Sequence, residues 1–219
     1  MSQYQIIFLI ISSLSLLVSL SVGYLAYFQA AKPKILIGSN LILFNSATVT
    51  PTEEVWGGVT FVLPLTFYNW SPRGGSIQQV RLIIGQKENP KEYFDMAWSN
   101  FVKFIDGITW EDEDVAQPIA ISGRSSVTKF VRFDWSPLAG ETLQIKSGQY
   151  EMVILVWTNG NIEKPNLVQE QSFYITEAVN AEYQTTVSNQ MSFGFWIPIN
   201  DNRRMNSTIN RADINKIYK

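Results

Sequence analysis

The chain has 219 residues, with 17 Lys+Arg, 19 Asp+Glu, no His and no Cys, and its formal net charge is −2. This balance provides no bulk electrostatic attraction to nucleic acid, so no nucleic-acid partner is expected. Without His or Cys, the chain has no Ser-His-Asp triad, cysteine nucleophile, disulfide, or zinc site built from nitrogen and sulfur ligands. We therefore predict no cofactor.

The first predicted element is a membrane-spanning helix over residues 6–28, preceded by a short tail over residues 1–5. The segment carries no charged residue and is rich in Ile, Leu and Val. As a helix it would be about 34 Å long, enough to cross a hydrocarbon core of roughly 30 Å. Tyr4 stands near one end, and Tyr24 and Tyr27 near the other, where rings with a polar tip suit the headgroup layer. The lipid bilayer is thus the first predicted partner.

The rival interpretation of this segment is a cleaved signal peptide, which needs a basic first region and small residues before the cut. The first five residues contain no Lys or Arg, so we expect an uncleaved single-pass anchor in the cell membrane. Lys32 and Lys34 follow the span, whereas only the terminal amine precedes it. The positive-inside tendency therefore favours a cytoplasmic C-terminal domain, although sandwich domains on single anchors are often exported.

After Pro33, runs of β-branched, aromatic and aliphatic residues alternate with clusters of Gly, Pro, Asn and Ser. This texture predicts strands over residues 34–44, 59–69, 76–86, 105–110, 126–135, 148–158 and 169–176. Short strands with frequent turns predict an all-β domain over residues 34–176, an immunoglobulin-like two-sheet β-sandwich. The run 150–157 is apolar on both faces, which predicts a central strand covered on both sides.

One segment, residues 90–104, predicts a short helix added to the sandwich. Asn89, Pro90 and Glu92 fit a cap residue, a first-turn proline and the third position of a capping box. Apolar residues then recur at three- and four-residue spacing, namely Phe94, Ala97, Trp98, Phe101, Val102 and Ile105. The helix face formed by Phe94, Trp98 and Phe101 either covers one end of the core or binds a protein partner, so these three residues are candidate partner-surface residues.

From about residue 177 the strand texture is lost, and residues 177–219 are predicted as a C-terminal extension. This extension holds an apolar island over residues 193–199, followed by a tail in which basic residues outnumber acidic ones. The island either docks back onto the domain or touches the bilayer, where basic residues would meet anionic lipid. Trp196, inside the island, is the fourth candidate partner-surface residue.

Acidic residues are the remaining candidates for chemistry, and residues 111–114 read Glu-Asp-Glu-Asp. This run lacks the glycine and the alternate spacing of a calcium loop, so a solvated loop without a metal is expected. Two carboxylates would suffice for glycoside hydrolysis, but spacing marks no pair. We predict no catalytic residue and no enzyme. The alternative is a carbohydrate-binding or carbohydrate-cleaving surface domain, because 7 Trp and 9 Tyr could stack on sugars.

Residues 61–69 read Phe-Val-Leu-Pro-Leu-Thr-Phe-Tyr-Asn and are followed by Gly-Gly-Ser-Ile at 74–77 and Val-Arg-Leu at 80–82. This stretch resembles a loose group of uncharacterised bacterial proteins with an N-terminal membrane anchor and an immunoglobulin-like sandwich. The resemblance implies the same anchor and fold, and it brings no catalytic residues. The predicted function is a single-pass membrane protein whose sandwich acts as a non-catalytic interaction or accessory module with a protein partner.

Overall fold

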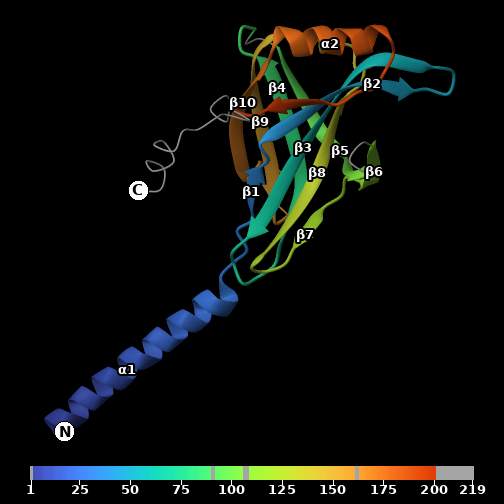
Figure 1. Ribbon diagram of the computed structural model, residues 1–219. Helices are drawn as coiled ribbons and strands as arrows, with labels where there is room; N and C mark the ends of the chain where they lie inside the picture. The colour runs from blue at the N-terminus through green and yellow to red at the C-terminus, as the bar shows by residue number, and fades with distance from the viewer. Residues whose placement is uncertain (1, 90–91, 106–108, 161–162, 201–219) are drawn as a thin grey trace.

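The computed structural model describes residues 2–89, 92–105, 109–160 and 163–200. An N-terminal helix leads into a β-sandwich, and a second helix lies across the far end of the sandwich (Figure 1). The first helix, α1 (Gln3–Gly23), continues as one π-helical turn, η1 (Tyr24–Phe28). Neither element buries a residue against the domain.

The N-terminal helix has the length and composition of a membrane span. From Gln3 to Phe28 it comprises 26 residues with a mean hydropathy of 2.4 over its most apolar window, a length of about 39 Å. Ser2 caps it, because its hydroxyl accepts from the Gln5 amide at 3.4 Å while the Gln5 side chain accepts from the Ser2 amide at 2.9 Å. Among the described residues this is the one helix long and apolar enough to cross a membrane.

The described residues of the domain form eleven strands, all paired antiparallel. They are β1 (Lys34–Ile37), β2 (Asn40–Val49), β3 (Glu54–Asn69), β4 (Gly75–Gln86), β5 (Tyr93–Ile105), β6 (Thr109–Val115), β7 (Ile119–Ile121), β8 (Ser125–Trp135), β9 (Gly148–Thr158), β10 (Leu167–Ile175) and β11 (Phe195–Pro198). The order is β10-β9-β4-β5-β8-β3-β2-β11, with β1 beside β3, β6 beside β5 and β7 beside β4. The predicted all-β fold is confirmed.

Strand β5 belongs to both layers of the sandwich. Its first half pairs with β4 up to Ala97, and its second half pairs with β8 from Trp98 onward, with a bulge between Trp98 and Asn100. We call the layer of β1, β2, β3, β8, β11, β6 and the second half of β5 sheet A. The layer of β10, β9, β4, β7 and the first half of β5 is sheet B. A bulge bends a strand and increases its twist, which allows one strand to turn from one sheet into the other.

The core lies between the inner faces of the two sheets. Phe61, Phe67 and Phe133 of sheet A are fully buried, and Tyr150 of sheet B is 2% exposed and stacks on Phe173 at a centroid distance of 5.1 Å. Each fully buried ring of this size contributes about 1.5–3 kcal/mol to folding through the hydrophobic effect. The core therefore supplies the main stabilisation of a domain that has no disulfide.

The helix predicted over residues 90–104 is wrong, because its described part forms strand β5. The residues Phe94, Met96 and Trp98 alternate toward the core, and the bulge then shifts the alternation by one residue to Phe101. Two strand alternations displaced by a bulge reproduce the three- and four-residue spacing of a helix. The expected helix start includes residues 90–91, which lie outside the described residues, and on either side of them the Glu92 amide donates to the Asn89 carbonyl at 3.2 Å.

The bounds of two other predicted strands and the burial of a third also differ from the prediction. The predicted strand 34–44 is interrupted at Gly38 and Ser39, and the predicted strand 105–110 instead contains the end of β5 and the start of β6, with residues 106–108 outside the described part. Strand β9 is central as expected, but Val153 and Leu155 on its outer face are only half-buried, so its second face is not fully covered.

The short added helix of this fold is α2 (Glu177–Ser188), within the segment predicted as an extension. Thr176 begins it, since its hydroxyl accepts from the Val179 amide at 3.2 Å. The helix buries Tyr183 and Thr186 against the end of the sandwich that lies away from α1 (Figure 1). Beyond it, β11 pairs with β2, so the apolar island docks onto the domain, which is one of the two outcomes predicted for it.

Candidate functional site

Five aromatic rings gather on the outer face of sheet A. The pairing registers bring them from five strands of this sheet, far apart in the sequence. We call this group the aromatic patch, and it consists of Phe44 (β2), Phe104 (β5), Trp110 (β6), Phe130 (β8) and Trp196 (β11).

Trp110 is the centre of the aromatic patch. Its ring lies 4.8 Å from Phe104, 5.3 Å from Phe130, 6.1 Å from Trp196 and 6.3 Å from Phe44, measured between centroids. These spacings are the ones at which aromatic pairs attract each other. Beneath the rings lie three buried aliphatic side chains, Ile42, Val62 and Val102, which form a second small apolar cluster. The patch is therefore a fixed surface on a sheet and not a mobile loop.

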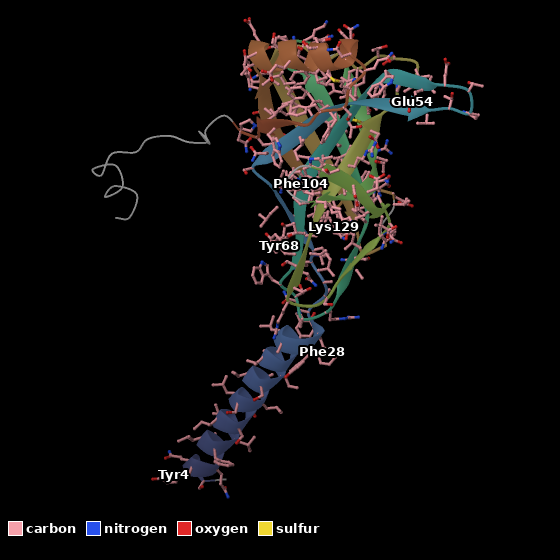
Figure 2. All side chains as sticks on the ribbon, turned by 45° about the vertical axis from the view of Figure 1, so that its right-hand side comes forward. Tyr4, Phe28, Glu54, Tyr68, Phe104 and Lys129 are labelled. Atoms are coloured by element: carbon pink, nitrogen blue, oxygen red, sulfur yellow. The ribbon has the colours of Figure 1, made fainter. Side chains whose placement is uncertain are left out.

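Two rings of the patch remain open to solvent. Phe104 is 41% exposed and Trp196 is 48% exposed, and their centroids lie 6.4 Å apart. Figure 2 shows Phe104 on the side of the domain, further from α1 than Tyr68 is. Neighbouring exposed aromatic side chains on a rigid face are typical of surfaces that bind another molecule.

A small cavity of about 150 Å³ lies beside the patch and adds polar groups to it. Phe44, Trp110 and Val62 form apolar walls, and Thr60, Asp112 and Arg132 are its polar lining. Arg132 donates from Nε to Asp134 at 2.9 Å and from Nη1 to Asp112 at 3.3 Å. Burial acts to lower the pKa of Arg132, but Asp134 and Asp112 outweigh it and hold that pKa above its usual value. This cation is permanent.

Asp134 ties three strands of sheet A together beneath the cavity. Besides Arg132, it accepts from the Thr60 hydroxyl at 2.5 Å and from the Ser99 hydroxyl at 2.6 Å. Hydrogen bonds to a charged group are stronger than those between neutral groups. The polar side of the cavity is therefore held in one geometry before any ligand arrives.

The acidic run 111–114 lies on strand β6 and not in the loop that was predicted, although its side chains are exposed as expected. Three of its carboxylates form ion pairs, Glu111 with Lys103 at 3.7 Å, Asp112 with Arg132 at 3.3 Å and Glu113 with Lys129 at 2.8 Å. Neighbouring side chains of a strand point to opposite faces, so the four carboxylates cannot converge. Within the described ranges, no group of three or more acidic residues is placed to hold a metal ion.

A second surface lies at the end of the domain where α1 joins it. Trp70 is 75% exposed and its ring lies 5.8 Å from that of Tyr68, which Figure 2 shows in the half of the domain nearer to α1. Arg124 donates to the Ala26 carbonyl at 3.1 Å, and Arg73 follows Trp70 in the same turn. Three loops at this end, residues 29–33, 70–74 and 122–124, contain no acidic residue, whereas the loop after β9, whose Asn159 donates to the Ala31 carbonyl, contains Glu163 and Lys164.

Of the four candidate partner-surface residues from the sequence, the structure places one on the patch. Trp196 is exposed there, whereas Phe94 is 8% and Phe101 is 3% exposed in the core. Trp98 is half-buried and its ring meets that of Phe101 at 5.6 Å. These three residues line the inside of the sandwich because they lie on a strand and not on a helix.

The other four rings of the patch were missed by the sequence analysis. Each is an outward-facing position of a strand, and the sequence does not show which strands are neighbours. One signal in the sequence could have found them. Phe44, Phe104, Phe130 and Trp110 are apolar at outward-facing strand positions, where the alternation of a half-exposed strand predicts a polar residue.

No protein-family model and no curated protein matches the chain. Among solved structures, a protein from Archaeoglobus fulgidus is similar at 11% identity over 67% of this chain and 98% of its own, with a TM-score of 0.31. An uncharacterised β-sandwich protein from Clostridium difficile is similar at 6% identity over 65% of this chain and 87% of its own, also with a TM-score of 0.31. Likeness at this level carries no argument about function, and membership of the bacterial anchored-sandwich group stays a prediction.

Proposed function

We propose that this protein is a non-catalytic, membrane-anchored binding protein, held in the bilayer by α1, whose sandwich contacts a partner protein through the aromatic patch. The observation that carries the proposal is the pair of exposed rings, Phe104 and Trp196, set on a rigid aromatic and aliphatic base. Aromatic side chains at the centre of a surface, with polar groups around them, are the composition of protein-binding hot spots.

The polar surroundings of the patch fit the same role. Arg132 and Asp112 line the cavity beside Trp110 and form an ion pair at 3.3 Å. A partner would bury the rings and meet fixed charges at the rim, which contribute to orientation more than to affinity. We infer a partner surface with a side chain able to enter the cavity, whose volume of about 150 Å³ suits a group of side-chain size and whose walls are both apolar and polar.

The anchoring half of the proposal is supported by the helix and by the way it joins the domain. The connection after η1 is held by the Lys32 amide donating to Asn69 Oδ1 at 3.4 Å and by Asn159 Nδ2 donating to the Ala31 carbonyl at 3.1 Å. A helix joined by so short and fixed a connection keeps the domain at the membrane surface.

The alternative of carbohydrate binding is less well supported by the geometry of the rings. Sugar rings stack on an open, flat aromatic face. The exposed rings of Phe104 and Trp196 are inclined at 74° to each other, and Trp110 and Trp196 at 46°, so the patch has no common plane. A protein surface can be complementary in shape to rings inclined in this way and is therefore the better match. A glycan array probed with the full-length protein would contradict this choice if Trp196→Ser abolished a specific glycan signal.

The proposal is tested by isolating the tagged full-length protein from its native membranes after mild crosslinking. We compare the wild type with Phe104→Ser, with Trp196→Ser and with Tyr174→Ser. Tyr174 is a matched control because it is 44% exposed and lies on β10 of the other sheet. We expect one crosslinked protein to be lost from both patch variants and retained by Tyr174→Ser.

Equal recovery of that protein with all three variants would show that the patch does not bind it, and the proposed function would be wrong. A melting curve of each variant separates loss of binding from loss of folding. Both patch variants must keep a melting temperature within a few degrees of the wild type for the comparison to count.

A further inference from the structure

A groove of about 560 Å³ separates β1 from β10, on a different side of the sandwich from the aromatic patch. Ile35, Ile37 and Gly38 line one wall, and Leu167, Gln169 and Gln171 line the other. Its size lies within the range of ligand sites, about 300–1,000 Å³. We call this groove the β1–β10 slot.

The wall formed by β1 presents unpaired backbone groups to the slot. The Gly38 amide donates to the Pro64 carbonyl at 2.8 Å, so residues 34, 36 and 38 direct their backbone groups toward β3. In an antiparallel strand these directions alternate, and therefore the N–H and C=O of Ile35 and Ile37 point away from β3, into the slot. Within the described part of the chain, β1 pairs with no other strand.

The opposite wall, β10, presents a second row of such groups. The Asn200 amide donates to the Ser172 carbonyl at 2.8 Å, so even-numbered residues of β10 direct their backbone groups away from β9. By the same alternation, the N–H and C=O of Val168 and Glu170 point into the slot. Among the residues that the structure describes, no strand lies between these two edges, and two unpaired strand edges facing one groove form a template for an added strand.

The direction of the missing strand follows from its neighbours. β11 pairs antiparallel with β2, and Ile199 forms an antiparallel bridge with Phe173 of β10. The slot continues the line of β11 and lies between β1 on one side and β10 on the other. Asn200, the last residue that the structure describes, has a φ of 60°, which is left-handed and not extended. The Asn200 side chain then occupies the end of the slot, bonded to Gln171.

We propose that the β1–β10 slot binds an extended segment of a partner polypeptide, which enters as a strand antiparallel to both β1 and β10. The two rows of backbone groups supply affinity by strand addition. Side chains on one face of the inserted strand would meet Ile35 and Ile37 on one wall and Gln169 and Gln171 on the other, so this face contacts an apolar wall and a polar wall at once. This site is independent of the aromatic patch and does not rest on the function proposed for it.

The test uses the full-length protein in lipid nanodiscs and random heptapeptides displayed on phage. The best selected peptide is synthesised and its affinity measured, and then each backbone nitrogen is methylated in turn. A strand paired on both edges loses affinity on methylation at odd and at even positions, about tenfold or less for each lost hydrogen bond. A peptide paired along a single edge loses affinity only at alternate positions, and that result would overturn the proposal.

Variants of the protein locate the site. Val168→Pro removes one slot-facing N–H at an edge position where proline is tolerated, and Val168→Thr keeps that N–H as the matched control. We expect a loss of about tenfold for Val168→Pro, from one hydrogen bond and the added ring, and less than twofold for Val168→Thr and for Trp196→Ser. Unchanged affinity in Val168→Pro would overturn the proposal. Binding only to a chain truncated after Asn200 would do so too, since residues 201–219 would then be the natural occupant.

Discussion

Arg124, in the turn before β8, donates from its guanidinium Nη2 to the carbonyl oxygen of Ala26 in η1 at 3.1 Å. Carbonyl groups at the end of a helix lack intrahelical donors and carry partial negative charge, which a guanidinium stabilises. The contact therefore joins the end of the apolar helix to the turn beside β8. If α1 spans the bilayer, this contact places Arg124 and Trp70 at the level of the headgroups.

The first prediction concerns attachment to the membrane. Residues Gln3–Phe28 form a helix with a mean hydropathy of 2.4 and none of it buried in the domain. Such a helix has no protein surface to cover it, and lipid is the solvent in which its apolar side chains are stable. Washing membranes with alkaline carbonate should leave the full-length protein in the pellet. Its appearance in the supernatant would contradict the anchor.

The second prediction places Trp70 in the headgroup layer. The full-length protein is reconstituted in phosphatidylcholine and phosphatidylglycerol vesicles that contain lipids brominated near the headgroup, which quench nearby indoles. Among the 7 Trp of the chain, Trp70 is 75% exposed at the anchored end, so Trp70→Phe should remove most of the quenching. Trp196→Phe, the control, should leave quenching unchanged. Equal quenching in both variants would show that this end does not touch the bilayer.

Much of the fold was predictable from the sequence because its signals are local. The strands β3, β4, β8, β9 and β10 appear within a few residues of their predicted bounds. The turn after β3 also follows from its residues, since the Ser71 amide donates to Asn69 Oδ1 at 3.1 Å, as expected of an Asn-containing turn. Period-two alternation and turn residues act over a few positions, and neither depends on tertiary contacts.

The candidate site was not predictable to the same degree, because it depends on register and on one bulge. The shift between Trp98 and Asn100 gives this strand the apolar spacing of a helix, so the sequence predicts a helix face that either covers the core or binds a partner, whereas the strand turns its three rings inward. The aromatic patch needs five strands in their final order before Trp110 meets Trp196 at 6.1 Å. Pairing between strands distant in sequence is a property of the whole fold and leaves no local pattern.

The third prediction concerns the side of the membrane on which the sandwich lies. Lys32 and Lys34 follow the helix, and no basic side chain precedes it. Positively charged residues beside a span are retained in the cytoplasm. A reporter that is active only in the cytoplasm, fused after Lys219, should therefore be active. Labelling of a cysteine placed at Tyr174 by an impermeant reagent in intact cells would reverse the assignment.

The fourth prediction is a loss of stability at alkaline pH. Burial, with a smaller effect of Tyr150, raises the pKa of Tyr183 above its usual value of 10.0. The unfolded chain ionises this phenol near pH 10 and the folded chain only at higher pH, so the free energy of unfolding is unaffected below pH 10 and falls as pH rises above it. In urea titrations, Tyr183→Phe should show a weaker fall between pH 9.5 and 11 than the wild type. Parallel curves would contradict the assignment.

The last prediction separates the core from the binding surface by comparing two tryptophans. Trp98 is half-buried on the core side of β5, with its ring 5.6 Å from Phe101, whereas Trp196 is 48% exposed on the aromatic patch. Trp98→Ser leaves a cavity and should cost about 3 kcal/mol, a fall in melting temperature of about 6–10 °C. Trp196→Ser loses only part of its contacts with Phe104 and Trp110, about 1 kcal/mol or 2–4 °C. Differential scanning calorimetry of the detergent-solubilised protein measures both. Equal falls would mean that Trp196 serves the core as much as Trp98 does, and the aromatic patch would then be a structural feature and not a surface free for a partner.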